Sequence, residues 1–276
     1  MSVVTFWSNG KEQTGKTMSI AAIATYMAIE HNKRILVIST ANKKDALENC
    51  FWETKKSRKL IGLFTSKNNY MDTQNGIDGL VKLMKSNKIS SDIITNYTKI
   101  VFKDRLEILL GSKTIEDKST YYPDIIKMAN QFYDLVFVDL DNSINEFSRS
   151  QILKDSNLII ANVNQRLASI DEFNEACEEE EYLESNKVLV LIGRYDKYSK
   201  YNSKNITRYL GRKKEILTIP YNTLYFEATE EAGVPDMFLK FRNLTDSEDR
   251  NGFFIQEVKR ASEAIIYKLQ DLQMGM

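Results

Sequence analysis

The sequence is poor in the residues that mark linkers, cross-links and membrane segments. Its 276 residues include only 3 prolines and 11 glycines, without a low-complexity tract, so no stretch has the composition of a linker. The 2 cysteines, Cys50 and Cys177, lie far apart without metal-ligand spacing, which favours reduced thiols. No apolar run approaches the ~20 residues that a membrane-spanning helix needs. We therefore expect one domain, residues 1–276, in a cytoplasmic protein without membrane attachment.

Charge is balanced as well as plentiful. The 38 Lys and Arg residues equal the 38 Asp and Glu residues, and 42% of the chain is hydrophobic, as in a globular protein with a full core. A formal net charge of zero argues against an overall nucleic-acid-binding coat, but it leaves room for a local basic patch. The single histidine, His31, follows a helical pattern and is more typical of a helix end than of a catalytic base.

Strand-like apolar runs alternate with helical patterns along most of the chain. The runs are Val3–Trp7, Ile35–Thr40, Leu135–Leu140, Leu158–Val163, Lys187–Tyr195 and Glu215–Pro220. Helical patterns cover Met18–His31, Ile77–Ser86, Tyr121–Asp134, Ser148–Asn157, Ser169–Ser185 and Gly252–Gln273. This alternation predicts an α/β fold with a mostly parallel central sheet and helices on both faces. The signal is weaker from Ala41 to Met128, where Phe102–Ser112 is interpreted as one strand ending in a turn.

A phosphate-binding loop follows the first predicted strand. Gly10, four intervening residues and Gly15-Lys16-Thr17 match the pattern G-x-x-x-x-G-K-[ST], and a helical pattern follows directly. In such a loop, backbone N–H groups and the helix dipole face the phosphates. Lys16 would neutralise the β- and γ-phosphates, and the Thr17 hydroxyl would hold Mg²⁺. The sequence therefore predicts a P-loop NTPase.

A second feature of the site lies at the ends of later strands. Asp139 comes near the end of a buried apolar run, as expected of a Walker-B-like carboxylate that reaches Mg²⁺. Ligands of parallel α/β sheets bind at the carboxyl ends of the strands. The phosphate loop, Asp139, Arg194 and Pro220 should all lie at that edge.

Three motifs, in the expected order, carry a resemblance to a known family. GKEQTGKT (Gly10–Thr17) resembles the deviant Walker A loop of the ParA/MinD family, in the SIMIBI class, with Lys11 as the signature lysine. Asp139 and the following DNSINEF resemble that family's switch II. The segment Ile219–Asp236 resembles its "I-P, then A, then G-x-P" segment near the base pocket.

The resemblance implies a single ParA/MinD-like nucleotide-binding domain that forms a face-to-face homodimer around two ATP molecules. Lys11 and Lys16 would be the catalytic lysines, Lys11 reaching the partner's phosphates and Lys16 its own, while Thr17 and Asp139 would hold Mg²⁺. The alternative for Lys11 is a solvated loop lysine. The implied nucleotide contacts are Gly10, Lys11, Glu12, Gln13, Thr14, Gly15, Lys16, Thr17 and Met18, with Arg194, Pro220, Tyr221 and Asn222 against the adenine.

Two departures from the family pattern bear on catalysis. Glu12-Gln13 stand where the family has two glycines, and glycine allows the closest backbone approach to phosphate. Ala41 stands where the second aspartate of a D-x-D pair positions the attacking water, and alanine cannot orient or deprotonate water. We therefore expect weak or no hydrolysis, with ATP as a dimer-forming ligand. This character is similar to the TadZ/CpaE-like pilus-localisation branch and to conjugation-linked relatives.

The expected outcome is spatial positioning of DNA or of a pilus, secretion or conjugation apparatus through a protein partner, at a cell pole or the nucleoid. The stretch Gly193–Lys214 is basic and interleaved with tyrosines, so it is a candidate for nonspecific DNA binding; a solvated helix face is the alternative. Two other functions stay open. One is a small-molecule P-loop kinase or ligase, and the other is a pseudo-ATPase adaptor that binds no nucleotide.

Overall fold

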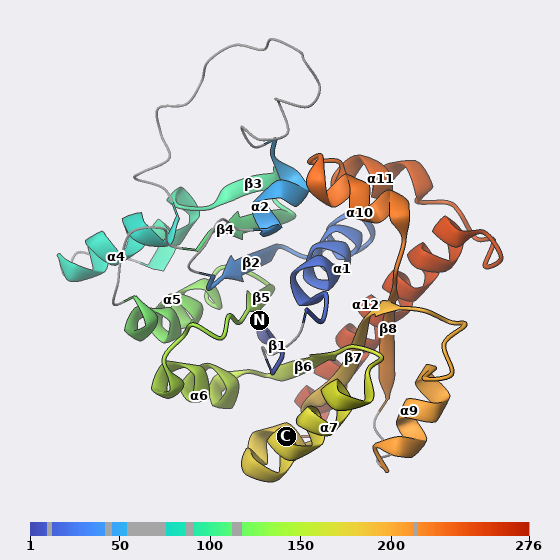
Figure 1. Ribbon diagram of the computed structural model, residues 1–276. Helices are drawn as coiled ribbons and strands as arrows, with labels where there is room; N and C mark the ends of the chain where they lie inside the picture. Colours follow the sequence, from blue (N-terminus) through green and yellow to red (C-terminus); the bar gives the residue numbers. More distant parts are fainter. Residues whose placement is uncertain are drawn as a thin grey trace.

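One eight-stranded sheet organises the chain (Figure 1). The computed structural model describes residues 1–9, 13–41, 46–53, 76–86, 91–111, 118–211 and 215–275. The strand order is β3-β4-β2-β5-β1-β6-β7-β8, and every neighbouring pair is parallel except β3 with β4. The strands are β1 (Ser2–Trp7), β2 (Ile35–Ser39), β3 (Lys99–Phe102), β4 (Leu106–Leu109), β5 (Leu135–Asp139), β6 (Leu158–Val163), β7 (Val188–Tyr195) and β8 (Ile216–Pro220). The predicted mostly parallel α/β sheet is confirmed.

Helices cover both faces of this sheet. They are α1 (Lys16–Glu30), α2 (Ala46–Phe51), α4 (Ile77–Lys85), α5 (Tyr122–Ala129), α6 (Glu146–Asp155), α7 (Leu167–Glu179), α8 (Glu181–Glu184), α9 (Ser203–Tyr209), α10 (Thr223–Glu230), α11 (Val234–Phe241) and α12 (Arg250–Met274), with 3₁₀ turns at Ser91–Asn96 and Ser119–Tyr121. Helices α1, α11 and α12 lie on one face, and α5, α6 and α7 lie on the other (Figure 1). None of the helices in the described part of the chain is long and apolar enough to cross a membrane.

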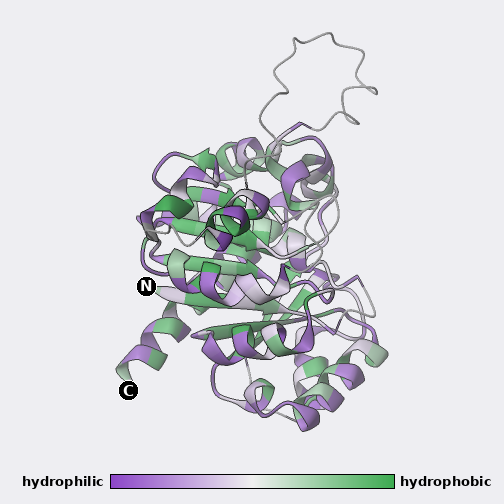
Figure 2. Cartoon of the chain, turned by 90° about the vertical axis from the view of Figure 1, so that its left-hand side faces the viewer, coloured by the Kyte–Doolittle hydropathy of each residue, from purple (hydrophilic) through white to green (hydrophobic). Residues whose placement is uncertain are grey.

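Each strand contributes to two hydrophobic cores because successive side chains point to opposite faces. In β1, Val4 and Phe6 pack in the core beneath α1, whereas Val3 and Trp7 pack in the core beneath α5 and α7. Burial on both faces explains why the strands are almost continuously apolar in sequence. Figure 2 shows this distribution, with hydrophobic strands inside and helices whose outer faces are polar.

Three predicted elements differ in detail. Phe102–Ser112 is not one strand, because Asp104 has φ 59° in a turn that folds β3 and β4 into an antiparallel hairpin. The helix predicted over Ser169–Ser185 is two helices, since the backbone of Glu180 is extended between α7 and α8. The helix predicted over Tyr121–Asp134 ends at Ala129.

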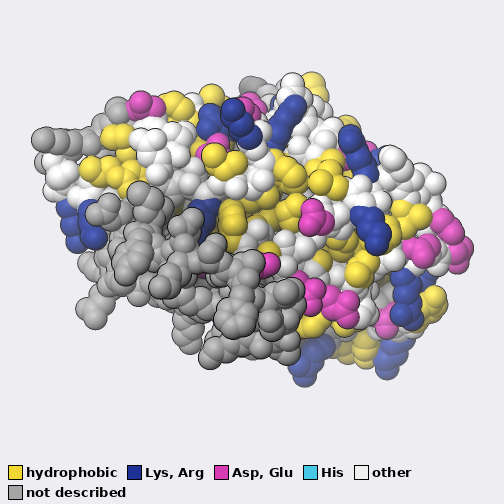
Figure 3. Space-filling view, turned by 90° about the horizontal axis from the view of Figure 1, so that it is seen from above, with side chains coloured by type: hydrophobic (Ala, Val, Ile, Leu, Met, Phe, Trp, Pro, Cys, Tyr) yellow, Lys and Arg dark blue, Asp and Glu magenta, His cyan; other side chains and the backbone are white. Residues whose placement is uncertain are grey.

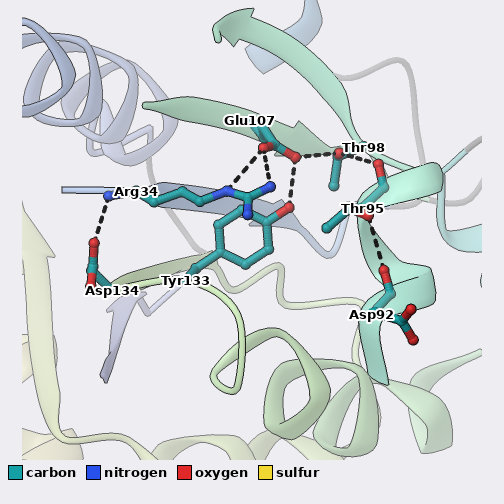
Figure 4. A network of polar contacts seen from close by, with 7 residues as sticks. All are labelled: Arg34, Asp92, Thr95, Thr98, Glu107, Tyr133 and Asp134. Carbon is teal, nitrogen blue, oxygen red and sulfur yellow. Dashed lines mark hydrogen bonds and ion pairs between the residues drawn. The ribbon is translucent and has the colours of Figure 1, made fainter. Parts of the chain in front are cut away.

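A buried ion pair holds the hairpin to the amino ends of the parallel strands (Figure 4). Glu107 in β4 is 4% exposed, and one of its carboxylate oxygens accepts from Arg34 Nη2 at 2.7 Å. The other oxygen accepts from Thr98 Oγ1 and from Tyr133 Oη, each at 2.6 Å. The Arg34 guanidinium also lies 4.8 Å from the centre of the Tyr133 ring. Every oxygen of the carboxylate is therefore satisfied by partners from three separate segments.

Removing this carboxylate should destabilise the fold. We expect Glu107→Ala to lower the free energy of unfolding by about 3 kcal/mol, because three donors lose their acceptor and Arg34 loses its counter-charge. Asp155→Ala is the matched control, since its 3.7 Å pair with Lys127 is about half exposed, and it should cost no more than about 0.5 kcal/mol. Urea unfolding measures the stability of both variants. Equal losses of stability would contradict the structural role given to Glu107.

The hydrogen bonds to Glu107 should also make the free energy of unfolding depend on pH. Burial alone would raise the pKa of the Glu107 carboxyl, but the hydrogen bonds from Thr98, Tyr133 and Arg34 outweigh burial and hold its pKa below the ordinary 4.5. Its stabilisation is therefore complete above the unfolded pKa and is lost as pH falls through the folded pKa. In urea unfolding between pH 7 and pH 3, the stability difference between the wild type and Glu107→Gln should shrink below about pH 4.5. A difference that stays constant with pH would refute this.

Candidate nucleotide-binding site

The end of the predicted phosphate loop leads directly into α1. Gly15 has φ 75°, a left-handed conformation that glycine adopts without steric cost, and α1 begins at the next residue, Lys16. The first N–H groups of a helix have no partners within the helix, so they are available to an anion. Gly10, Lys11 and Glu12 lie outside the described residues, and the roles predicted for them stay predictions.

The loop lies directly against the end of β7. A Cβ on Gly193 would overlap the carbonyl oxygen of Thr14, so only glycine allows this approach. The next residue, Arg194, has φ 53°, which is uncommon for a residue with a side chain. Its Cγ would lie 3.3 Å from a Cβ added to Gly15, and its Nη1 donates to Gln13 Oε1 at 3.5 Å. Arg194 is thus beside the loop, as predicted, and Gly193 is a residue that the sequence interpretation missed.

Charged and hydroxyl groups meet where α1 begins and β5 ends. The Thr17 hydroxyl donates to Asp139 Oδ2 at 2.7 Å. Lys16 Nζ lies 3.3 Å from Asp139 Oδ1 and also donates to the carbonyl of Leu140. The side chains of Lys16 and Asp139 are only 11% and 7% exposed, so the pair is strongly shielded from solvent. The structure brings together these three predicted residues.

The oxygens of Thr17 and Asp139 are of the chemical type that binds Mg²⁺. Hydroxyl and carboxylate oxygens are the protein ligands that Mg²⁺ prefers, and it usually completes its shell with water and substrate phosphates. Thr17 and Asp139 supply two such oxygens side by side. Across the described ranges, no cluster of three or more His, Cys, Asp or Glu residues could hold a metal by itself. The arrangement therefore suits an ion that arrives with a phosphate ligand.

A cavity of about 250 Å³ opens beside the loop. Its lining residues are Gly15, Met18, Ser19, Arg194, Ile219, Pro220, Tyr221, Asn222, Tyr225, Phe226, Thr229 and Glu230. The predicted base-contacting residues thus lie on one cavity with the loop. Tyr225 joins the two sides of this cavity, since its hydroxyl donates to the Met18 carbonyl at 2.6 Å. Tyr225 was not predicted as a site residue, although it lies in the segment that follows the I-P pair.

The side chain of Asn222 connects two helices beside this cavity. Its Oδ1 accepts from Tyr225 N at 2.8 Å and caps α10, while its Nδ2 donates to Asn251 Oδ1 at 2.9 Å. Asn222 therefore fixes the β8–α10 junction to α12. A base in the cavity would meet the backbone at this position.

Ala41 follows the carboxyl end of β2, at the position where the resemblance leads us to expect a catalytic aspartate. Thr40 Oγ1 donates to the Asp139 carbonyl at 3.0 Å and accepts from Asp141 N at 2.7 Å, so β2 is tied to the segment after β5. Ala41 follows, with its carbonyl so close to Gly111 that a Cβ there would overlap it. Asp45, the nearest acidic residue in sequence, lies outside the described residues. Ala41 itself supplies only a methyl group.

Comparison with known proteins identifies the fold. No protein-family model matches the sequence, and a search of curated proteins finds no match. Among solved structures, a ParA family ATPase from Chlorobium tepidum TLS is 16% identical with a TM-score of 0.66, covering 97% of this chain and 98% of the other. The septum site-determining protein MinD from Pyrococcus horikoshii, complexed with Mg-ADP, is 15% identical with a TM-score of 0.63, covering 97% and 98%. A putative plasmid partition protein from Borrelia burgdorferi, bound to AMPPNP, is 17% identical with a TM-score of 0.61, covering 99% and 98%.

These similarities extend over nearly the whole chain at low sequence identity, so they establish the fold. The chain has the fold of the ParA/MinD type of P-loop NTPase.

The close approach of Gly193 to the loop can be tested directly. We expect Gly193→Ala to destabilise the protein by about 2 kcal/mol or more, since the added methyl group must displace the backbone of Thr14. Gly211→Ala is the control, because Gly211 has φ 60° with no atom within 4 Å of an added Cβ, so it should cost only about 1 kcal/mol of backbone strain. Urea unfolding compares the two. A larger loss for Gly211→Ala would contradict the packing described for β7.

Proposed function

We propose that this chain is an ATP-binding protein of ParA/MinD character that forms an ATP-dependent homodimer and positions DNA or a pilus, secretion or conjugation apparatus. The observation that carries the proposal is the group formed by Lys16, Thr17 and Asp139 at the start of α1. It lies at the edge of the sheet that also holds the 250 Å³ cavity. The residues proposed to bind the phosphates and the base thus lie at one site.

Nucleotide binding follows from the chemistry of this group. The triphosphate would take the N–H groups at the start of α1, and it would compete with Asp139 for the ammonium group of Lys16. Thr17 and Asp139 would hold Mg²⁺, which offsets the negative charge of the phosphates when it is bound. The adenine would occupy the cavity between Arg194 and Pro220–Asn222.

We expect little or no ATP hydrolysis at this site. An attacking water needs a polar group to orient it, and Ala41 has none. The neighbouring Thr40 hydroxyl is already engaged by two backbone groups. ATP would therefore act chiefly as a ligand that holds two subunits together, a character similar to that of the TadZ/CpaE-like branch.

Apolar side chains near the site support a dimer on this face. Phe147 at the start of α6 is 79% exposed, and Leu167 at the start of α7 is 36% exposed. Both helices begin at the carboxyl edge of the sheet, where the phosphate loop lies. In the proposed dimer, these two side chains would be covered by the partner subunit. In the proposed dimer, Lys11 would reach the phosphates bound by the partner subunit.

The partner and any DNA would bind elsewhere. The basic segment around α9 carries the exposed Lys200, Lys204 and Arg208 and the 86% exposed Tyr198, all in the described part of Gly193–Lys214. On the face in Figure 3, by contrast, hydrophobic side chains gather across the middle, and Lys and Arg are scattered around them. The α9 segment is therefore the better candidate for nonspecific DNA. A protein partner would direct the complex to a pole or to the nucleoid.

ATP-dependent association is the test of this proposal. Light scattering should show a doubling of mass when ATP and Mg²⁺ are added, while phosphate release stays slow. Lys16→Ala should lose ATP binding, because it removes the shielded ammonium group beside Asp139. Lys11→Ala should keep ATP binding but lose the dimer. Lys33→Ala, an exposed lysine beyond the end of α1, is the matched control and should behave as the wild type.

Each alternative has its own outcome in these assays. No ATP binding at millimolar concentration would overturn the proposal in favour of an adaptor that binds no nucleotide. Rapid phosphate release would refute the interpretation of Ala41. ATP-dependent phosphorylation or ligation of a small molecule, without a change of mass, would favour a P-loop kinase or ligase.

A further inference from the structure

A second cavity lies next to the proposed base cavity. It measures about 580 Å³, and the two cavities share the residues Pro220, Tyr221 and Asn222 after β8. Its other walls come from the segment that follows β7 and from the residues around the start of α12. Because Tyr195, Tyr198 and Tyr221 line this cavity, we call it the tyrosine groove. The proposed ATP site leaves the groove without a ligand of its own.

Two of the tyrosine rings in this groove are accessible to a ligand. Tyr198 is 86% exposed and Tyr221 is 58% exposed, whereas Tyr195 is buried. Phe253 of α12 is half-buried and adds a further ring to the wall. Aromatic side chains present flat faces on which the planar rings of a ligand can stack. The groove therefore suits a ligand that carries planar rings.

Two cations line the same groove. Lys197 Nζ lies 4.8 Å from the centre of the Phe253 ring and 5.4 Å from the centre of the Tyr198 ring, which is within the range of cation–π attraction. Arg250, the first residue of α12, is exposed. Neither cation forms an ion pair with a residue in the described part of the chain. Both charges are therefore available to an anionic ligand.

Hydrogen bonds hold the wall that carries Lys197 and Tyr198. Gln165, in the connection between β6 and α7, accepts from Asp196 N at 2.7 Å and donates to the carbonyls of Asp196 and Tyr201 at 3.0 and 2.9 Å. Asp196 Oδ1 in turn accepts from Tyr198 N at 2.9 Å. The segment that follows β7 is thus fixed by side chains before any ligand arrives, so little ordering is needed on binding.

We propose that the tyrosine groove binds single-stranded nucleic acid. Its bases would stack on Tyr198 and Tyr221, and its phosphates would meet Lys197 and Arg250. A single strand fits better than a duplex, because the faces of paired bases are stacked inside the duplex and cannot reach the rings. This inference rests on the DNA-binding part of the proposed function and names the form of nucleic acid, but it does not need ATP.

The size and surroundings of the groove favour a strand over one free nucleotide. The groove has more than twice the volume of the base cavity. The segment that forms one wall continues into the basic helix α9, where the exposed Lys204 and Arg208 would take the next phosphates. A chain of nucleotides can use both features at once, whereas a single nucleotide can use only the groove.

An acidic residue in the groove limits the expected affinity. Glu248 lines the groove and is exposed, so its carboxylate would repel a phosphate. We therefore expect Glu248→Gln to bind a single strand more tightly than the wild type does. With Lys197 and Arg250 as the two phosphate contacts in the groove, the logarithm of affinity should fall with the logarithm of salt concentration with a slope of about −1.4. Lys197→Gln should reduce this slope by about 0.7.

Fluorescence anisotropy of a labelled oligothymidylate of about 12 nucleotides tests the stacking. Tyr198→Ala should weaken binding about tenfold, because one base loses its stacking partner, and Tyr198→Phe should bind as the wild type does. Tyr267→Ala is the matched control, since Tyr267 is a 71% exposed tyrosine of α12 outside the groove. It should leave binding unchanged. Unchanged binding in Tyr198→Ala, or an equal loss in Tyr267→Ala, would overturn the assignment.

Three further probes identify the class of ligand. A duplex of the same length and a poly-glutamate peptide should bind more weakly than the single strand, because neither offers free base faces. Thymidine monophosphate should also bind more weakly, since it cannot reach α9. Equal affinity for the duplex or for the peptide would show that charge alone is recognised, and equal affinity for the monophosphate would show a nucleotide site. Each of these results would overturn the proposal.

ATP binding is measured separately, so the two proposals can fail separately. Lys16→Ala should lose ATP binding and keep the affinity for the oligonucleotide, and Tyr198→Ala should show the reverse. If ATP causes dimerisation but the oligonucleotide does not bind, the tyrosine groove fails and the proposed ATP-dependent dimer stands. If the oligonucleotide binds in a Tyr198-dependent way but ATP does not bind, the groove stands and the proposed function fails.

Discussion

The contact of Asp139 with the first turn of α1 connects the sheet to the loop. Asp139 ends β5, and its neighbours in register are Phe6 in β1 and Ser39 in β2. Lys16 and Thr17 both reach its carboxylate from α1. One side chain at the end of the central strands therefore fixes the direction in which α1, and with it the loop, leaves the sheet. The pairing also restrains a lysine that would otherwise carry an uncompensated charge in a shielded place.

A second buried carboxylate, Glu107, connects separate segments at the opposite end of the sheet. Glu107 joins β4, the segment before β2 and the segment before β5 through Arg34 and Tyr133. The two carboxylates differ in their surroundings. Glu107 has all its acceptor positions filled by the fold, which suits a purely structural role. Asp139 shares its oxygens with a lysine and a threonine at a helix start. In the proposed complex, Mg²⁺ would take a place beside Asp139, and Lys16 would turn to a phosphate.

Local patterns predicted the parts of the fold that are regular along the sequence. The six parallel strands other than β4 were predicted because burial on both faces leaves a continuous apolar run in the sequence. The phosphate loop was predicted because the spacing of its glycines, lysine and threonine is the one that phosphate binding needs. The β3–β4 hairpin was not, since a charged residue such as Glu107 breaks the apolar pattern and its partner Arg34 lies 73 positions away. Likewise, nothing near Gly193 in sequence shows that Thr14 approaches it. Contacts between distant segments need the fold before they can be seen.

The loop itself shows how the chain accommodates residues that are not glycine. Gln13 stands where a glycine was expected, yet it is exposed and meets the guanidinium of Arg194, whose own backbone is in the left-handed region. The described end of the loop also lies against β7, where Gly193 lets the strand approach the Thr14 carbonyl closely. A loop supported by its surroundings depends less on its own flexibility. In the proposed complex, this contact would hold the described end of the loop, residues 13–15, against β7 while a nucleotide is bound.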